Sequence, residues 1–123
     1  MHEAHFPGRA PIDSYGNGGF RFADMSHKGS ILCLPSGIYA WDVIGPDQLS
    51  PEKFDQLLLE ARDIEILLVG TGRELLPLQG SLKDCLREHS VSGDPMSTGA
   101  AVRTYNVLLA EKRAVAAALI AVE

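Results

Sequence analysis

The first half of the chain shows the hydrophobic and polar spacing of short strands. Residues 20–22 alternate apolar, polar and apolar side chains, which is the period of a half-buried strand. Residues 30–34 are almost all apolar and predict a second strand that is covered on both faces. The segment 26–29 between them has the composition of a turn, so we predict that the two strands pair as a hairpin. A short extended segment is predicted over residues 38–41.

The middle of the chain predicts a helix followed by an inner strand. The Ser50-Pro51-Glu52 segment combines an N-cap hydroxyl, a proline at the first helical position and an acid near the positive end of the helix dipole. The apolar residues that follow have helical spacing and share one face: Phe54, Leu57, Leu58 and Ala61. Residues 64–69 are nearly all aliphatic, as expected for a central parallel strand covered on both sides.

Two further helices and an edge strand are predicted after this strand. A second helix begins at Pro77, with an apolar face made of Leu78, Leu82, Cys85 and Leu86. Residues 90–96 predict a short strand at a sheet edge, because Pro95 cannot donate a hydrogen bond to a neighbouring strand. Thr98 is predicted to cap a third helix, whose apolar face carries Val102, Tyr105 and Leu109.

Residues 111–122 leave two structures open. Their alanine-rich composition favours a continuation of the third helix to the end of the chain. A strand from about residue 115 to 122 would instead give the sheet another inner member. Helix propensity is a weak guide where tertiary contacts compete with it, so propensity alone does not choose between the two.

Length, composition and charge restrict the class of protein. A chain of 123 residues predicts one domain, which we place at residues 12–123 after a flexible N-terminal arm over residues 1–11. With 46% hydrophobic and 22% charged residues, the composition is that of an ordinary globular protein. The net charge of −5 argues against a nucleic-acid partner, because phosphate binding requires clustered lysine and arginine. The two cysteines, Cys33 and Cys85, lie in apolar runs and are interpreted as reduced thiols.

The sequence predicts neither a membrane-spanning segment nor an enzyme. No apolar run approaches the roughly 20 residues that cross a bilayer, and the N-terminus does not have the pattern of a signal peptide. We therefore expect a bacterial-type cytoplasmic protein or an organelle matrix protein. His2 and His5 could bind a metal only adventitiously, and no serine or threonine has an evident base partner. No cofactor is predicted.

The best candidate for a binding site is a pair of loops. Residues 70–73, Gly-Thr-Gly-Arg, follow the buried strand, where backbone N–H groups and Arg73 could hold a small anion. Thr98 begins a helix, and the N–H groups of a helix N-terminus also suit an anion. If the two loops are neighbours, one crevice would be lined by Gly70, Thr71, Gly72, Arg73, Thr98, Arg103 and Asn106. The alternative is structural: the glycines provide a tight turn, Thr98 caps the helix, and Arg103 and Asn106 tie it to nearby carbonyls.

An aromatic pair gives a second candidate surface. Tyr39 and Trp41 lie in the short extended segment after a Pro-Ser-Gly turn. Exposed together, they would suit a hot spot for a protein partner. The alternative is that the tryptophan is part of the core.

Three segments together resemble a known family. They are residues 12–20, residues 68–72 and the run from Met96 to Leu119, whose most specific part reads Thr-x-x-Ala-x-Arg-Thr-Tyr-Asn at 98–106. In these segments the chain resembles a family of single-domain proteins first labelled only as a domain of unknown function. The family was founded on a hypothetical methanogen protein, and it includes a mitochondrial assembly factor for respiratory complex I. An adipogenesis-associated protein belongs to the same superfamily.

The resemblance implies both a fold and a function. The implied fold is a three-layer α/β domain with a mixed central sheet, an N-terminal hairpin and about three helices, in which residues 115–119 form a strand. The family usually has glycine where this chain has Lys112, and an unbroken strand where it has Gly93 and Pro95. The implied function is a non-enzymatic interaction or assembly factor with a protein partner, peripheral to the inner membrane. The alternative is a small-anion-binding protein or enzyme that uses the two loops.

Overall fold

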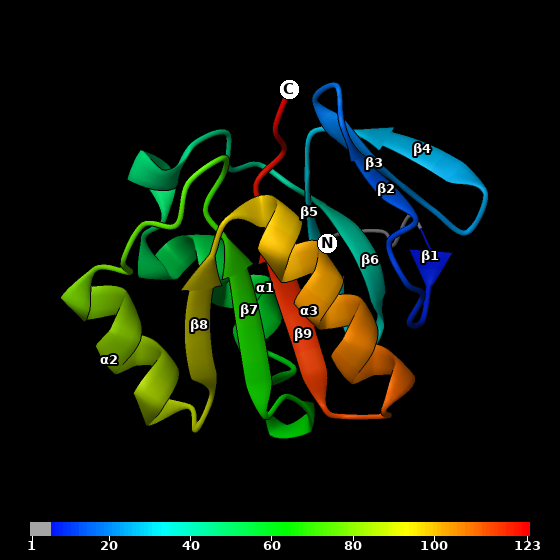
Figure 1. The fold of residues 1–123 in the computed structure, drawn as a ribbon. Coiled ribbons are helices and arrows are strands. Elements are labelled where there is room, and N and C mark those ends of the chain that lie inside the picture. The colour runs from blue at the N-terminus through cyan, green and yellow to red at the C-terminus, as the bar shows by residue number, and fades with distance from the viewer. Residues whose placement is uncertain (1–5) are drawn as a thin grey trace.

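The computed structural model describes residues 6–123, and its largest element is a six-stranded mixed sheet (Figure 1). The strand order is β1-β6-β5-β9-β7-β8. Strand β7 runs parallel to both β8 and β9, whereas the pairs β5–β9, β5–β6 and β1–β6 are antiparallel. The strands span Phe6–Pro7 (β1), Ser30–Leu34 (β5), Gly37–Trp41 (β6), Ile66–Gly70 (β7), Ser92–Met96 (β8) and Val115–Leu119 (β9).

Apolar clusters on the two faces of this sheet give the molecule three layers. Leu67 and Val69 of β7 belong to a cluster with residues of α1 (Asp55–Leu58) and α2 (Gly80–Glu88). Leu68 belongs to the opposite cluster, with residues of α3 (Thr98–Ala110) and of a second, smaller sheet. Because successive side chains of a strand point to opposite faces, β7 is covered on both sides. The predicted inner strand and the three-layer α/β fold are confirmed.

The second sheet replaces the hairpin predicted for residues 20–34. Strand β3 (Gly19–Phe22) pairs with β2 (Ser14–Gly16) and β4 (Met25–Lys28), and β5 pairs with β6 and β9 instead. Both turns of this sheet have two residues with positive φ, Asn17-Gly18 and Ala23-Asp24, as a type I′ turn requires. The prediction of a turn over residues 26–29 was wrong, because the chain already reverses at Ala23-Asp24.

The predicted first helix is reduced to short turns. Two 3-10 helices, Pro51–Phe54 and Ala61–Asp63, flank the single turn of α1, and a third lies at Pro46–Gln48. The Ser50 hydroxyl donates to the Glu52 carboxylate at 3.0 Å and caps no backbone N–H group. Phe54 and Leu57 are nevertheless fully buried. The periodicity therefore identified the buried face, but it did not determine the length of the helix.

Two other predicted elements are present with shifted bounds. Helix α2 begins at Gly80 and not at Pro77, and its buried residues include Leu82 and Leu86. Strand β8 lies at the edge of the large sheet, as Pro95 predicted.

The ambiguous segment 111–122 forms strand β9 between β5 and β7. Helix α3 ends at Ala110, and Lys112 takes a φ of 60°, the left-handed conformation that usually ends a helix at glycine. All five residues of β9 are fully buried. Ala117 belongs to the cluster with α3 on one face of the sheet, and Ala116 and Ala118 belong to the cluster with α1 and α2 on the other. Burial between two strands thus prevails over the helix propensity of alanine.

Part of the expected N-terminal arm is structured. Residues Phe6–Pro7 form β1 against β6, the N–H of Gly8 donates to Ser36 O at 2.9 Å, and Ala10 is buried. Residues 6–8 are thus hydrogen-bonded at the edge of the large sheet. His2 and His5, the adventitious metal ligands, lie outside the described residues.

Both cysteines are free thiols, and one of them lies in the core. Cys33 of β5 is fully buried and has a hydrogen bond with the Tyr105 hydroxyl of α3. Burial raises the pKa of Cys33 far above its ordinary value, although the bond to Tyr105 opposes the shift. Burial also raises the pKa of Tyr105, and the charge of an ionised Cys33 would raise it further.

These shifts predict a loss of stability in alkaline solution. The folded state keeps both protons, whereas the unfolded chain releases them near its ordinary pKa values of about 8.5 and 10. Stability from this pair is therefore complete below about pH 8.5 and falls as the pH rises, by up to about 1.4 kcal/mol per pH unit for each group. Urea unfolding between pH 8 and 11 measures the slope, which the Cys33→Ala and Tyr105→Phe variants should reduce. A slope unchanged in both variants would contradict this assignment.

Candidate functional site

The two loops singled out in the sequence are neighbours in the structure. They leave the same ends of the parallel strands β7 and β8, where Gly70 lies opposite Met96. The N–H of Thr71 donates to Met96 O at 2.8 Å, and the N–H of Thr98 donates to Gly72 O at 2.7 Å. The two loops therefore meet, which was the condition for a shared crevice, and they meet by bonding directly to each other.

Thr98 is the centre of this contact and not the cap of the helix. The N-cap is Ser97, whose hydroxyl accepts from the N–H of Ala100 at 3.4 Å. The Thr98 side chain is fully buried; its hydroxyl donates to Ile120 O at 2.7 Å and accepts from the N–H of Gly72 at 3.1 Å. One hydroxyl thus joins α3 both to the loop after β7 and to the residue after β9.

The close approach of α3 explains the first glycine of the loop. A β-carbon at Gly70 would lie 3.1 Å from the α-carbon and hydroxyl of Thr98 and from a methyl group of Leu119. The second glycine has another reason, because Gly72 adopts a φ of 107° that side chains disfavour. Both glycines serve the packing and geometry of the strand exit.

Three of the backbone N–H groups that an anion site would use are already engaged. The N–H groups of Thr71, Gly72 and Thr98 all donate to acceptors of the chain itself. The Thr71 hydroxyl is also occupied, because it lies within hydrogen-bond distance of Glu74 O and Met96 O and accepts from the N–H of Leu76. The geometry therefore matches the structural interpretation of the two loops.

The arginines and Asn106 have different places. Arg73 and Arg103 are both exposed. Asn106 forms two hydrogen bonds with one residue: its Oδ1 accepts from the N–H of Ile12 at 2.9 Å, and its Nδ2 donates to Ile12 O at 2.8 Å. Asn106 therefore ties α3 to the start of the small sheet.

The aromatic pair is not an exposed hot spot. Trp41 is only 7% exposed; its indole N–H donates to Lys53 O at 2.8 Å, and its ring packs edge-on against Phe54 with centroids 5.5 Å apart. Tyr39 is half-buried, and its hydroxyl contacts that of Ser36 at 2.5 Å. The structure matches the alternative in which Trp41 is part of the core, because the 3-10 helix Pro51–Phe54 covers that end of β6.

An apolar surface that the sequence analysis did not identify lies beside the loops. In the connection from β7 to α2, Leu75 is 59% exposed and Leu76 is 38% exposed. Leu76 borders an open groove of about 310 Å³, which we call the leucine groove; it is lined by Pro46, Asp47, Leu49, Leu76, Pro77, Leu78 and Gln79. The available signal was a Leu-Leu-Pro sequence that belongs to neither the strand before it nor the helix after it.

Comparison with known proteins places the chain in a family. The model of the family described as "Protein of unknown function (DUF498/DUF598)" matches residues 12–120. The chain belongs to this family. The resemblance that the three sequence segments indicated is thus confirmed.

A curated relative of this DUF498/DUF598 chain has a named role. The mouse protein NADH dehydrogenase (ubiquinone) 1 alpha subcomplex assembly factor 3 is 30% identical over 96% of this chain. The chain spans 64% of the length of that relative. Relatives of this chain are thus complex I assembly factors.

Solved structures confirm the fold. A protein from Bartonella henselae, described as an outer membrane protein, has a TM-score of 0.94 and 65% identity, and the match covers 97% of this chain and 100% of that one. A Bordetella pertussis protein described as an Mth938-like domain has a TM-score of 0.80 and 27% identity, with 91% of this chain and 85% of that one covered. The chain therefore has an Mth938-like fold. Within residues 6–123, no helix combines the length and the apolar character needed to cross a membrane.

Proposed function

We propose that this chain is a non-enzymatic interaction factor that supports the assembly of a respiratory NADH dehydrogenase. The main support is its likeness to assembly factor 3, which extends over 96% of the chain. The loops that suggested an anion site give the alternative little support, because three of their N–H groups are used to hold the fold together. Protein binding requires a surface, and the exposed leucines provide one.

The leucine groove is the surface that we assign to the partner. Leu75 and Leu76 project apolar side chains from a connection that is itself held in place by the Thr71 hydroxyl. Prolines and leucines dominate the lining of the groove, and Asp47 adds a negative charge to it. Apolar anchors surrounded by polar groups are typical of protein interfaces. A partner segment with apolar side chains flanked by lysine or arginine would complement this surface.

Charged substitutions at Leu76, which lines the leucine groove, and at its exposed neighbour Leu75 should weaken partner binding. We expect the double variant Leu75→Glu, Leu76→Glu to recover about tenfold less NADH dehydrogenase subunit by affinity purification from the organism that encodes the chain. In a strain without the chain, native gels should show less assembled NADH dehydrogenase, and the wild-type chain but not the double variant should restore it. Both leucines are exposed, so the free energy of unfolding should change by no more than about 0.5 kcal/mol.

Leu59→Glu provides the matched control. Leu59 is 86% exposed but does not line the groove, so the same change of charge there should leave partner recovery unchanged. Equal recovery with the double variant and wild type would reject the groove as the partner surface. Normal amounts of assembled NADH dehydrogenase without the chain would reject the assembly function.

The proposed function includes a location. We place the chain in the cytoplasm, peripheral to the inner membrane, where it would meet the growing complex. Cell fractionation should find it in the cytoplasmic fraction and, in part, on inner membranes from which high salt or carbonate removes it. Recovery with outer membranes, as the description of the Bartonella henselae relative suggests for that protein, would overturn this placement.

A further inference from the structure

The small sheet has an edge on which a further strand could pair. Among residues 6–123, β4 has only one neighbour, β3. The N–H of Gly29 donates to Gly18 O, and residues of an antiparallel pair alternate in the side to which their backbone groups point. The backbone groups of Met25 and His27 therefore form hydrogen bonds with β3, whereas those of Ser26 and Lys28 point away from the sheet. We call these outward groups the β4 edge.

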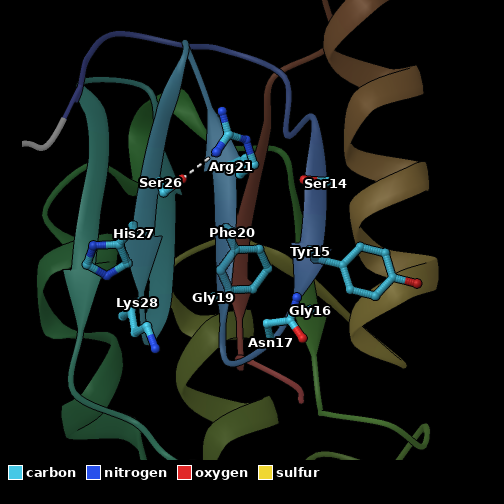
Figure 2. Close-up of a pocket in the computed structure, with 10 residues that line it drawn as sticks. All are labelled: Ser14, Tyr15, Gly16, Asn17, Gly19, Phe20, Arg21, Ser26, His27 and Lys28. Carbon is cyan, nitrogen blue, oxygen red and sulfur yellow. Dashed lines mark hydrogen bonds between the residues drawn. The ribbon is translucent and has the colours of Figure 1, made fainter.

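The exposed face of this sheet is cationic and hollow beside the β4 edge. The register places Ser14, Arg21 and Ser26 in one row across the three strands, and Gly16, Gly19 and Lys28 in the next. The two glycines leave the second row without side chains between β2 and Lys28, at a depression of about 330 Å³ (Figure 2). No side chain fits at Gly19, because a β-carbon there would overlap His27 O. The depression is thus built into the backbone.

Two positive charges flank this depression. Arg21 and Lys28 are exposed, and neither forms an ion pair with any described residue. Nη1 of Arg21 donates to the Ser26 hydroxyl at 2.7 Å, which directs the guanidinium group toward the β4 side of the sheet (Figure 2). Asp13 lies before β2 and Asp24 lies in the β3–β4 turn, whereas the Glu123 carboxylate lies beside Gly18 in the β2–β3 turn. In a chain with a net charge of −5, this face attracts negative groups locally.

We propose that the β4 edge binds an extended acidic segment of a protein partner, which adds a fourth strand to the small sheet. The proposal rests on the protein-binding function proposed above and assigns a second contact to it. Backbone hydrogen bonds to Ser26 and Lys28 would hold the segment, as in other cases of strand addition. Residues of the segment opposite Ser26 and Lys28 would point to the exposed face, where their carboxylates reach Lys28 and Arg21.

The geometry specifies the sequence pattern of the segment. Because side chains alternate across a strand, every second residue should be acidic. The residues between them would point to the face that carries Met25 and His27, both half-buried, and Met25 packs against the apolar cluster of α3. These intervening residues should therefore be apolar. A lysine on an edge strand also discourages pairing with segments that carry no negative charge.

A pair of synthetic peptides tests the proposal directly. The probe is a peptide of alternating glutamate and valine, and the control is the same peptide with lysine in place of glutamate. Titration into the isotopically labelled full chain should shift the amide resonances of Ser26, Lys28 and Arg21 most strongly with the glutamate peptide. The lysine peptide should bind at least about tenfold more weakly, because its charges face Arg21 and Lys28. Equal binding of both peptides, or shifts centred outside β3 and β4, would overturn the proposal.

Two variants separate backbone pairing from charge. Ser26→Pro removes an outward N–H without breaking the β3–β4 ladder and should abolish peptide binding, whereas Ser26→Ala keeps that N–H and should bind nearly as wild type does. Lys28 is exposed, so the Lys28→Glu variant should fold, and it should weaken binding of the glutamate peptide by about tenfold. This variant tests the proposal independently of whether Ser26→Pro folds. Undiminished binding by Lys28→Glu contradicts the proposal.

The outcome is independent of the leucine groove. If the peptide does not bind but the Leu75→Glu, Leu76→Glu variant still loses its partner, the β4 edge is rejected and the proposed function stands. If the peptide binds and cells lacking the chain assemble NADH dehydrogenase normally, the β4 edge stands and its partner belongs to another process.

Discussion

Replacing Thr98 by valine is expected to lower the free energy of unfolding by about 2–5 kcal/mol. Valine has nearly the same shape as threonine but no hydroxyl, so Ile120 O loses its donor and the N–H of Gly72 loses its acceptor. The side chain that joins them is fully buried, and each unsatisfied buried backbone group costs about 1–3 kcal/mol. Urea unfolding at neutral pH should show a lower midpoint with an unchanged slope.

Thr98→Ser is the control for this experiment. Serine keeps the hydroxyl and loses one methyl group, so its cost should be about 1 kcal/mol. Equal losses for the serine and valine variants would show that packing of the methyl group, and not the hydroxyl, holds the loops together. A valine variant as stable as wild type would contradict the central role given to this hydroxyl.

Replacing Asn106 by alanine is expected to cost about 1–3 kcal/mol and to loosen the small sheet. The variant removes both hydrogen bonds to the backbone of Ile12, a residue that is only 2% exposed. Since this pair of bonds fixes the segment that enters β2, amide exchange in β2 and β3 should quicken more than in β7. Hydrogen exchange and urea unfolding measure the two effects.

Arg103→Ala is the matched control on the same helix. Arg103 is exposed and lies less than one turn before Asn106, so its loss should change stability by no more than about 0.5 kcal/mol. Asn106→Asp should resemble alanine, because a carboxylate retains an acceptor for the N–H of Ile12 but turns a second oxygen toward Ile12 O. Uniform exchange rates in the alanine variant would argue against a local tie.

The candidate site shows where sequence reasoning succeeded and where it failed. A buried strand followed by an edge strand raised the condition that the loops after residues 70 and 96 are neighbours, and the parallel pair β7–β8 meets it. The same reasoning assumed that the N–H groups of those loops stay free. Their acceptors, Met96 O, Gly72 O and the Thr98 hydroxyl, come from the opposite loop. Whether a donor is satisfied depends on such distant partners.

The two turns of the small sheet differ in how clearly the sequence marks them. Asn17-Gly18 between short strands is a strong indication of a two-residue hairpin turn, and it forms one here. Ala23-Asp24 gave no such warning, because alanine rarely takes positive φ. Because this second turn was not predicted, β3 was expected to pair with the segment of β5, whereas it pairs with β4. The apolar residues of β3, Phe20 and Phe22, belong to the cluster that contains residues of α3.

The local sequence pattern identifies several of the segments that other parts of the chain cover. The aliphatic run of β7, the apolar face that contains Phe54 and Leu57, and the proline that marks β8 as an edge strand all follow from the chemistry of neighbouring residues. Residues 115–119 are a strand, which the family resemblance implied but helix propensity did not decide. Only the tertiary structure shows that Trp41 is covered and that Leu75 is not. The physical reason is that local patterns set the tendency of a segment to be buried, whereas its hydrogen-bond partners and its cover come from residues far away in the chain.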